Sequence, residues 1–150
     1  MSNPDISPSL PGWMQDHIRR YLATDGADGH LYDLTKAGGG VVPCLLLTTI
    51  GRRSGKPLLL PLIYGEAKGA YVIVASKGGA PDHPTWFLNL VAHPAVEIQV
   101  KDQHVIATAR VAHGQERADL WRQMTAIYAP FTEYQTKTAR EIPVVVLDPV

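Results

Sequence analysis

The chain has 150 residues, with 14 basic and 14 acidic side chains and a single cysteine. A domain of this size buries enough apolar surface to fold without disulfides or metals, and its balanced charge creates no overall field that would attract nucleic acid. Its longest apolar runs are far shorter than the ~20 residues of a membrane-spanning helix. Because Cys44 lies inside an apolar run and no secretory signal is present, we expect a buried thiol and a reducing, cytoplasmic location.

The N-terminal part of the chain predicts a leader and then a helix. Residues 1–10 contain three Ser and two Pro and are expected to be a flexible leader, so that residues 11–150 form the single domain. Residues 11–23 have helical spacing of apolar side chains, which are Trp13, Met14, Ile18, Tyr21 and Leu22. This face could pack on the body of the protein, cover a pocket or contact a membrane surface. The Gly- and Asp-rich residues 24–40 are expected to be a flexible connection.

A hairpin with a cationic loop is predicted next. Residues 41–50 and 57–64 read as two strands joined by a six-residue loop, GRRSGK. Pro57 and Pro61 lack an N–H donor, so the second strand should lie at an edge or carry a bulge. The loop places Arg52, Arg53 and Lys56 together. These three cations could form an anion clamp or could simply be solvated.

The stretch VIVASKGGAPDHPTWFLNL, residues 72–90, has the parts of an anion-binding cradle. A strand over residues 71–75 ends in Ser76, Lys77, Gly78 and Gly79, and a helix is expected to begin near Pro84, with Asp82 or His83 as a cap, and to end near His93. Glycine lets backbone N–H groups approach an oxyanion, and successive N–H groups form a positive nest. The alternative is an ordinary Gly-Gly turn beside a solvated lysine. Trp86 and Asn89 should occupy neighbouring positions on the helix surface.

The rest of the chain predicts an antiparallel α+β protein. A turn is expected over residues 65–69, strands over residues 96–100, 104–111 and 142–147, and a helix over residues 114–128. About six strands joined mainly by hairpins are expected to close into a small barrel. Tyr64, Tyr128, Phe131 and Tyr134 form an aromatic group, which is either a core stripe or a pocket whose phenol hydroxyls need partners.

Several classes of site have no support in the sequence. The six histidines show no metal-ligand spacing, so no metal site is expected. There is no G-x-S-x-G nucleophile elbow, P-loop or dinucleotide-binding pattern. Two anion clamps and a tyrosine-lined pocket instead suggest a long anionic cofactor with a planar, apolar reacting ring.

Three stretches carry a family resemblance: LTTIGRRSGKPLLLPL, VIVASKGGAPDHPTWFLNLVAHP and IYAPFTEYQ with IPVVVLDP. In this order they resemble the deazaflavin-dependent nitroreductase family of actinobacteria, over roughly residues 11–149. The resemblance implies a six-stranded antiparallel split β-barrel with flanking helices, like the pyridoxamine-phosphate-oxidase-like FMN-binding proteins. It also implies hydride transfer from reduced coenzyme F-420, an 8-hydroxy-5-deazaflavin, to quinones, activated enones or nitroaromatic compounds.

The resemblance also implies roles for particular residues. The phosphate of the cofactor would be held by Ser76, Lys77, Gly78 and Gly79, and its acidic tail would face Arg52, Arg53, Ser54 and Lys56. The ring and its linker would be seated by Pro61, Leu62, Ala75, Pro84, Trp86 and Asn89. The catalytic, substrate-side tyrosines would be Tyr128, Tyr134 and Tyr64. This sequence has Phe131 where some relatives have a tyrosine, which leaves nitroimidazole reduction open.

Two other functions remain alternatives at this point. The protein could be an FMN-dependent reductase of the same fold, although the arginine pair favours a cofactor with a polyglutamate tail. It could also be a non-catalytic deazaflavin carrier, which would not need a tyrosine pocket. A homodimer is a further expectation, because small barrels of this size often cover a sheet face by dimerising.

Overall fold

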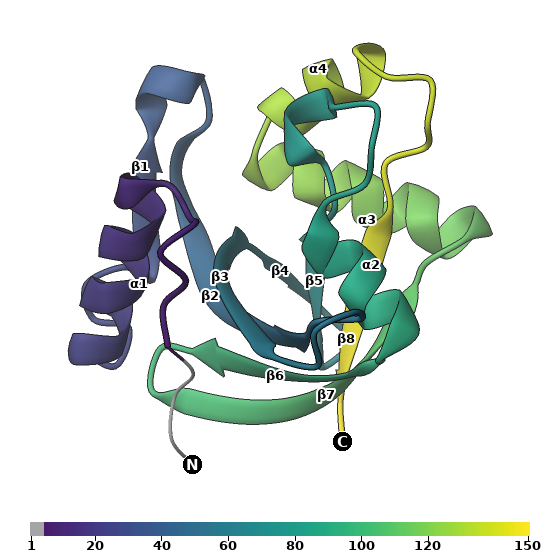
Figure 1. Cartoon of the computed structure of the whole chain (residues 1–150). Helices are drawn as coiled ribbons and strands as arrows, with labels where there is room; N and C mark the ends of the chain where they lie inside the picture. The colour runs from purple at the N-terminus through teal and green to yellow at the C-terminus, as the bar shows by residue number, and fades with distance from the viewer. Residues whose placement is uncertain (1–4) are drawn as a thin grey trace.

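Eight strands form one curled antiparallel sheet in the computed structural model, which describes residues 5–150 (Figure 1). The order across the sheet is β1-β2-β6-β7-β8-β5-β4, and β3 pairs with β2 outside this path. The strands are β1 (Leu31–Leu34), β2 (Gly40–Ile50), β3 (Pro57–Ile63), β4 (Gly65–Ala67), β5 (Ala70–Val74), β6 (Ala95–Val100), β7 (Gln103–Val111) and β8 (Val144–Pro149). The predicted α+β split barrel is confirmed, but the predicted count of six strands is wrong.

The β2–β3 hairpin was predicted correctly. Its register runs from Cys44 opposite Ile63 to Ile50 opposite Pro57, which leaves the six-residue loop at residues 51–56. Among residues 5–150, β3 pairs only with β2. This strand is therefore the edge strand that its two prolines require.

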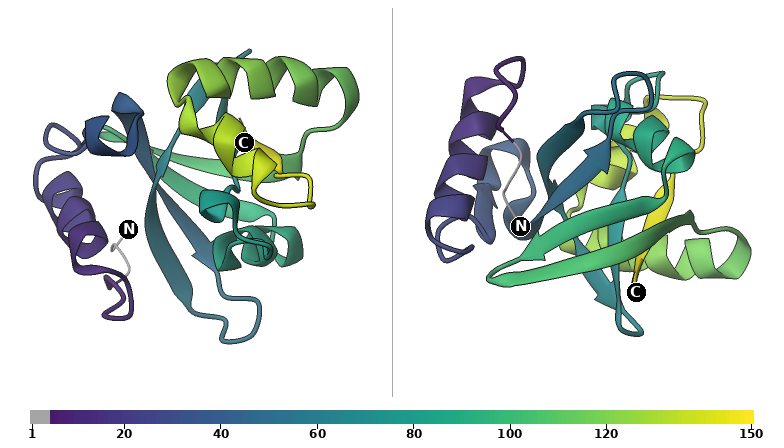
Figure 2. Two further views of the ribbon diagram at one scale, coloured as in Figure 1. Left: turned by 90° about the horizontal axis from the view of Figure 1, so that it is seen from above. Right: turned by 60° about the horizontal axis from the view of Figure 1, so that its bottom comes forward.

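The helices lie on two sides of the curled sheet (Figure 2). Helix α1 (Gly12–Ala23) covers one side, and α2 (Thr85–Ala92), α3 (Gly114–Ile127) and α4 (Pro130–Thr136) lie on the other. Two short 3-10 turns complete the elements, η1 (Thr35–Ala37) and η2 (Lys77–Gly79). None of the described helices has the length and apolar character needed to cross a bilayer.

The apolar face of α1 packs on the body of the protein. Ile18 and Tyr21 are fully buried in a cluster with Leu46 and Leu59. Since these side chains point inward, Trp13 is the large apolar residue of α1 that stays exposed, and the packing offers little else for the membrane contact considered for residues 11–23.

Residues 5–10, part of the predicted leader, contact the body of the protein, and residues 1–4 lie outside the described part. Ile6 and Leu10 pack against the cluster beneath α1. The backbone N–H of Leu10 donates to the carbonyl of Ser7, which forms a turn. The apolar side chains among the polar ones thus anchor this segment.

Three local predictions were also wrong. Residues 24–40 are not simply a connection, because they contain β1 and η1, and the predicted turn at residues 65–69 contains β4. Both strands are short. Each is held in strand conformation by antiparallel pairing with a longer strand, β1 with β2 and β4 with β5. At α2 the N-cap is Pro84, and no side chain of Asp82 or His83 caps the helix.

Candidate functional site

The loop between β2 and β3 is folded so that its cations point outward. The N–H of Gly51 donates to the carbonyl of Lys56 at 2.8 Å, and the N–H of Lys56 donates to Oγ of Ser54 at 3.1 Å. Ser54, which was expected to face the acidic tail, thus already supports the loop. Arg52, Arg53 and Lys56 are exposed, and none of them pairs with a carboxylate within residues 5–150.

Asn89 of α2 ties this loop to the sheet. Its Oδ1 accepts a hydrogen bond from the N–H of Arg52 at 3.1 Å, and its Nδ2 donates to Oγ1 of Thr49 at 3.3 Å. Asn89 and Trp86, three residues apart on α2, are both buried. The amide is in the position to hold the loop in one orientation relative to α2.

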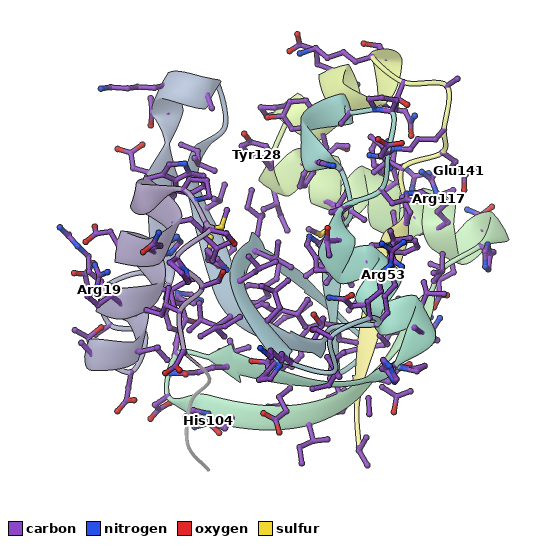
Figure 3. All side chains as sticks on the ribbon, viewed as in Figure 1. Arg19, Arg53, His104, Arg117, Tyr128 and Glu141 are labelled. Carbon is purple, nitrogen blue, oxygen red and sulfur yellow. The ribbon has the colours of Figure 1, made fainter. Side chains whose placement is uncertain are left out.

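A cavity of about 730 Å³ opens beside this loop. Its lining includes the three cations of the loop and only one carboxylate, Asp5, among the described residues. Thr85, the first residue of α2, and Asn89 also line it. Arg53 lies beside α2 in Figure 3. A cavity with this charge excess favours an anion, because these cations form no ion pair with any carboxylate in residues 5–150.

The second candidate cradle, residues 76–79, presents a row of free amides. The N–H groups of Ser76, Lys77 and Gly78 have no acceptor within residues 5–150. Lys77, Gly78 and Gly79 have φ values of 46°, 62° and 84°, so three consecutive residues are left-handed. Lys77 and Gly78 are exposed. Unpaired successive amides beside a lysine form the kind of nest that binds a phosphate.

The two cationic groups are connected through one segment but do not line one cavity. Residues 76–79 are absent from the lining of the cavity at Arg52. They lead through Pro84 into α2, whose first residue, Thr85, does line it. The two groups are therefore joined by residues 80–84 and the start of α2.

Tyr128 and Tyr134 were brought together as the sequence predicted. Their hydroxyls lie 3.2 Å apart, and Tyr128, at the end of α3 (Figure 3), is buried. Burial and the bond to Tyr134 raise the pKa of Tyr128. The ring of Tyr128 packs so closely against Gly39 that a Cβ there would overlap Cε1 and Cδ1. The Tyr128 hydroxyl, with its raised pKa, thus keeps its proton at neutral pH.

Tyr64 and Phe131 occupy different environments from this pair. The hydroxyl of Tyr64 lies 2.7 Å from Nε2 of His30, and burial raises its pKa to about 12. Tyr64 belongs to another core cluster than Tyr128, so the structure does not join it to the pair. Phe131 is buried and packs edge-on against Tyr128 at 4.9 Å between ring centroids.

The residues expected to seat the ring lie on β3, on β5 and before α2. Pro61 and Leu62 are on the edge strand β3, opposite Leu46 and Leu45. Ala75, Pro84 and Trp86 are buried. The edge of β3 that faces away from β2 has no strand partner within the described residues, so its backbone groups are available to a ligand.

Comparison with known proteins identifies the family. A sequence model described as F420H(2)-dependent quinone reductase matches residues 13–149. The chain belongs to this family. An F420H(2)-dependent quinone reductase of Mycobacterium tuberculosis is 40% identical over 134 residues, which cover 87% of this chain and 86% of that protein.

Two solved structures agree with this F420H(2)-dependent quinone reductase fold. A protein described as F420-H2 dependent reductase (FDR-A) is 45% identical, with a TM-score of 0.66 over 71% of this chain and 94% of the other. A second, described as a domain-swapped dimer, is 40% identical, with a TM-score of 0.69 over 95% of this chain and all of the other (100%).

Membership of the F420H(2)-dependent family decides two alternatives left by the sequence. It favours coenzyme F-420 over FMN as the cofactor, and a reductase over a non-catalytic carrier. The residues present fit such a cofactor. Free amides and Lys77 suit its phosphate, and a cavity with three unpaired cations suits its carboxylate tail.

Four further residues around these groups were not predicted from the sequence. Arg140 donates to three carbonyl oxygens around residues 76–79, His30 contacts Tyr64, Gly39 contacts Tyr128, and Thr85 lines the cationic cavity. Arg140, His30 and Gly39 each contact a residue distant in the chain. The glycine triplet at residues 38–40 was the one signal available, because such a run permits close approach of another side chain.

Proposed function

We propose that this protein reduces a quinone with reduced coenzyme F-420, and that residues 51–56 and 76–79 hold the two anionic parts of the cofactor. The observation that carries the proposal is the row of unpaired amides at Ser76, Lys77 and Gly78 beside a lysine. The cofactor supplies a hydride from C5 of its ring when bound. Everything else in the reaction depends on how the chain positions and polarises the reactants.

Residues 76–79 are the proposed phosphate site. The amides donate to the phosphate oxygens, and Nζ of Lys77 adds a charged donor worth ~1.5–3 kcal/mol. Arg52, Arg53 and Lys56 attract the carboxylates of the tail, with Asn89 fixing the loop through the amide of Arg52. Because the cations are exposed, this second contribution should weaken with salt.

The Tyr128–Tyr134 pair is the proposed group that polarises the acceptor. Either hydroxyl can donate to the other; when Tyr134 donates, the proton of Tyr128 is free to bond a quinone carbonyl oxygen. That hydrogen bond stabilises the negative charge which develops on the oxygen. Burial of Tyr128 keeps water from competing for the same proton.

Replacement of Tyr128 by Phe tests this role. Turnover of reduced coenzyme F-420 with menadione should fall about tenfold or more, with the Kd of the oxidised cofactor nearly unchanged. Tyr32→Phe is the matched control, since the hydroxyl of Tyr32 makes no hydrogen bond within residues 5–150. Equal turnover of Tyr128→Phe and wild type would remove Tyr128 from the mechanism.

Activated enones and nitroaromatic compounds are proposed as further acceptors of the same site. Their carbonyl or nitro oxygen can accept the same phenol hydrogen bond. At the third position of the aromatic group, Phe131 is buried and offers no hydroxyl, so nitro acceptors should be reduced more slowly than menadione. A parallel screen of the three acceptor classes decides this.

A homodimer is also proposed. The relative described as a domain-swapped dimer covers nearly the whole chain, and the outer face of the β1–β2 ribbon exposes Leu31 and Val41 at 63% and 60%. Two apolar side chains on one face favour contact with a second copy. Light scattering of wild type and of Leu31→Lys tests it: a monomeric wild type would refute the dimer.

A further inference from the structure

Arg140, which lies between α4 and β8, binds the carbonyls on both sides of residues 77–79. Its Nη1 donates to the carbonyl oxygen of Ala75 at 3.2 Å and its Nη2 to that of Ser76 at 2.8 Å. Its Nε donates to the carbonyl oxygen of Ala80 at 2.9 Å. One guanidinium thus fixes the entry and the exit of the proposed phosphate loop.

The same guanidinium also orients His83. Nη1 of Arg140 lies 3.1 Å from Nδ1 of His83. Since a guanidinium can only donate, Nδ1 must accept, and His83 is neutral. Burial first, and then the charge of Arg140, lower the pKa of His83, while Asp82 opposes them. Four of the five N–H groups of Arg140 are therefore engaged within the protein.

These contacts set the direction of the free amides. The described residues contain no cis peptide bond, and in a planar trans peptide the C=O and the following N–H point in opposite directions. When Arg140 holds the carbonyls of Ala75 and Ser76, the N–H groups of Ser76 and Lys77 must point away from Arg140. Both N–H groups lack an acceptor within residues 5–150.

The loop needs such support because its backbone is strained. Lys77 has a φ of 46°, a left-handed conformation that is unfavourable for a residue other than glycine. Contacts with neighbouring residues must hold the backbone in this conformation if it is to persist. Beyond Arg140, the loop contacts α4, where Gly79 lies against the backbone of Tyr134.

We infer that Arg140 is a positioning residue for the cofactor phosphate: it holds the peptide planes of residues 75–77 so that their amides face the anion, and it does so without touching the cofactor. This inference rests on the proposed phosphate site at residues 76–79. It assigns Arg140 a role in affinity for one part of the cofactor, distinct from a general role in folding.

The test compares two ligands and three variants. The ligands are coenzyme F-420 and its deazaflavin riboside, which has the same ring but neither phosphate nor tail; binding is measured as a change in ligand fluorescence. Arg140→Ala should weaken binding of coenzyme F-420 about tenfold or more, as loss of a residue that orients a binding group does, and should change the riboside Kd less than about twofold. Arg122→Ala, at an exposed arginine, should change neither.

The outcomes distinguish failure of the role of Arg140 from failure of the proposed phosphate site at residues 76–79. Lys77→Ala should also weaken only the phosphate-containing ligand; if it affects both ligands equally or neither, the phosphate site itself is refuted. If Lys77→Ala is selective and Arg140→Ala is not, the inference about Arg140 alone is overturned. Should Arg140→Ala fail to fold, Arg140→Lys replaces it, because one ammonium cannot span three carbonyls; a selective loss supports the inference, and an unchanged ratio of the two Kd values refutes it.

Discussion

Gly78 and Gly79 are adjacent and both have a left-handed backbone, but only Gly79 is closely packed against other residues. They are therefore a matched pair for substitution by alanine. A Cβ at Gly79 would lie 2.6 Å from the carbonyl oxygen of Tyr134 and 3.0 Å from Cβ of Lys137. A Cβ at Gly78 would meet nothing within 4 Å. Replacement of each by alanine therefore separates backbone strain from the contact between the loop and α4.

The structure gives a magnitude for each change. Both alanines incur the left-handed penalty of roughly 1–2 kcal/mol. Gly79→Ala must in addition displace a helix backbone, and overpacking of this kind costs typically ~1–3 kcal/mol. We therefore expect Gly79→Ala to lower the free energy of unfolding by ~2–5 kcal/mol, and Gly78→Ala by ~1–2 kcal/mol.

Urea unfolding of the two variants and wild type, followed by circular dichroism, measures this difference. In thermal unfolding of a domain of this size, each kcal/mol of additional destabilisation in Gly79→Ala should lower the melting temperature by about 2–4 °C. Gly79→Ala should also reduce menadione turnover further, since Tyr134 moves with α4. Equal destabilisation by the two alanines would show that α4 does not pack on the loop as described.

Three further predictions follow from the same contacts. Arg53→Ala should weaken binding of coenzyme F-420 and flatten its dependence on salt, as measured by titration at several ionic strengths; an unchanged salt slope would contradict the cationic tail site. Asn89→Leu should raise the Kd of coenzyme F-420, because the N–H of Arg52 loses its acceptor and the tail-binding loop is released. The Kd of the deazaflavin riboside should not change, and an equal effect on both Kd values would contradict this role of Asn89. Burial lowers the pKa of His17 below 6.5, so the unfolded state binds the proton more tightly and the folded state loses stability as pH falls from about 7 toward 5. The melting temperature should therefore fall less between pH 7 and pH 5 in His17→Gln than in the wild type. A larger fall in the variant would contradict this prediction.

The elements that the sequence predicted well are those with a strong local signal. The β2–β3 hairpin follows from two apolar runs and a Gly-rich loop, and α2 ends before Pro94 because that proline disfavours helical geometry in the preceding residue. The strands β1 and β4 were missed because they have four and three residues. Their pairing with β2 and β5 decides their conformation, and no local pattern could have predicted it.

The candidate site shows the same division between local and long-range information. The cationic loop and the Ser-Lys-Gly-Gly segment are recognisable as stretches, whereas Arg140 is separated by 60 to 65 residues from the carbonyls it binds. Likewise, Tyr64 was grouped with Tyr128 by residue type, but folding places it beside His30. Residue types indicated the candidate anion-binding groups, and only the topology could show what supports them.

The most direct test of the central claim is a crystal structure of the protein with oxidised coenzyme F-420. We predict phosphate oxygens within about 3.2 Å of the amides of Ser76 and Lys77, and tail carboxylates beside Arg52 and Arg53. Electron density for the phosphate at any other place, with these amides still unpaired, would contradict the account.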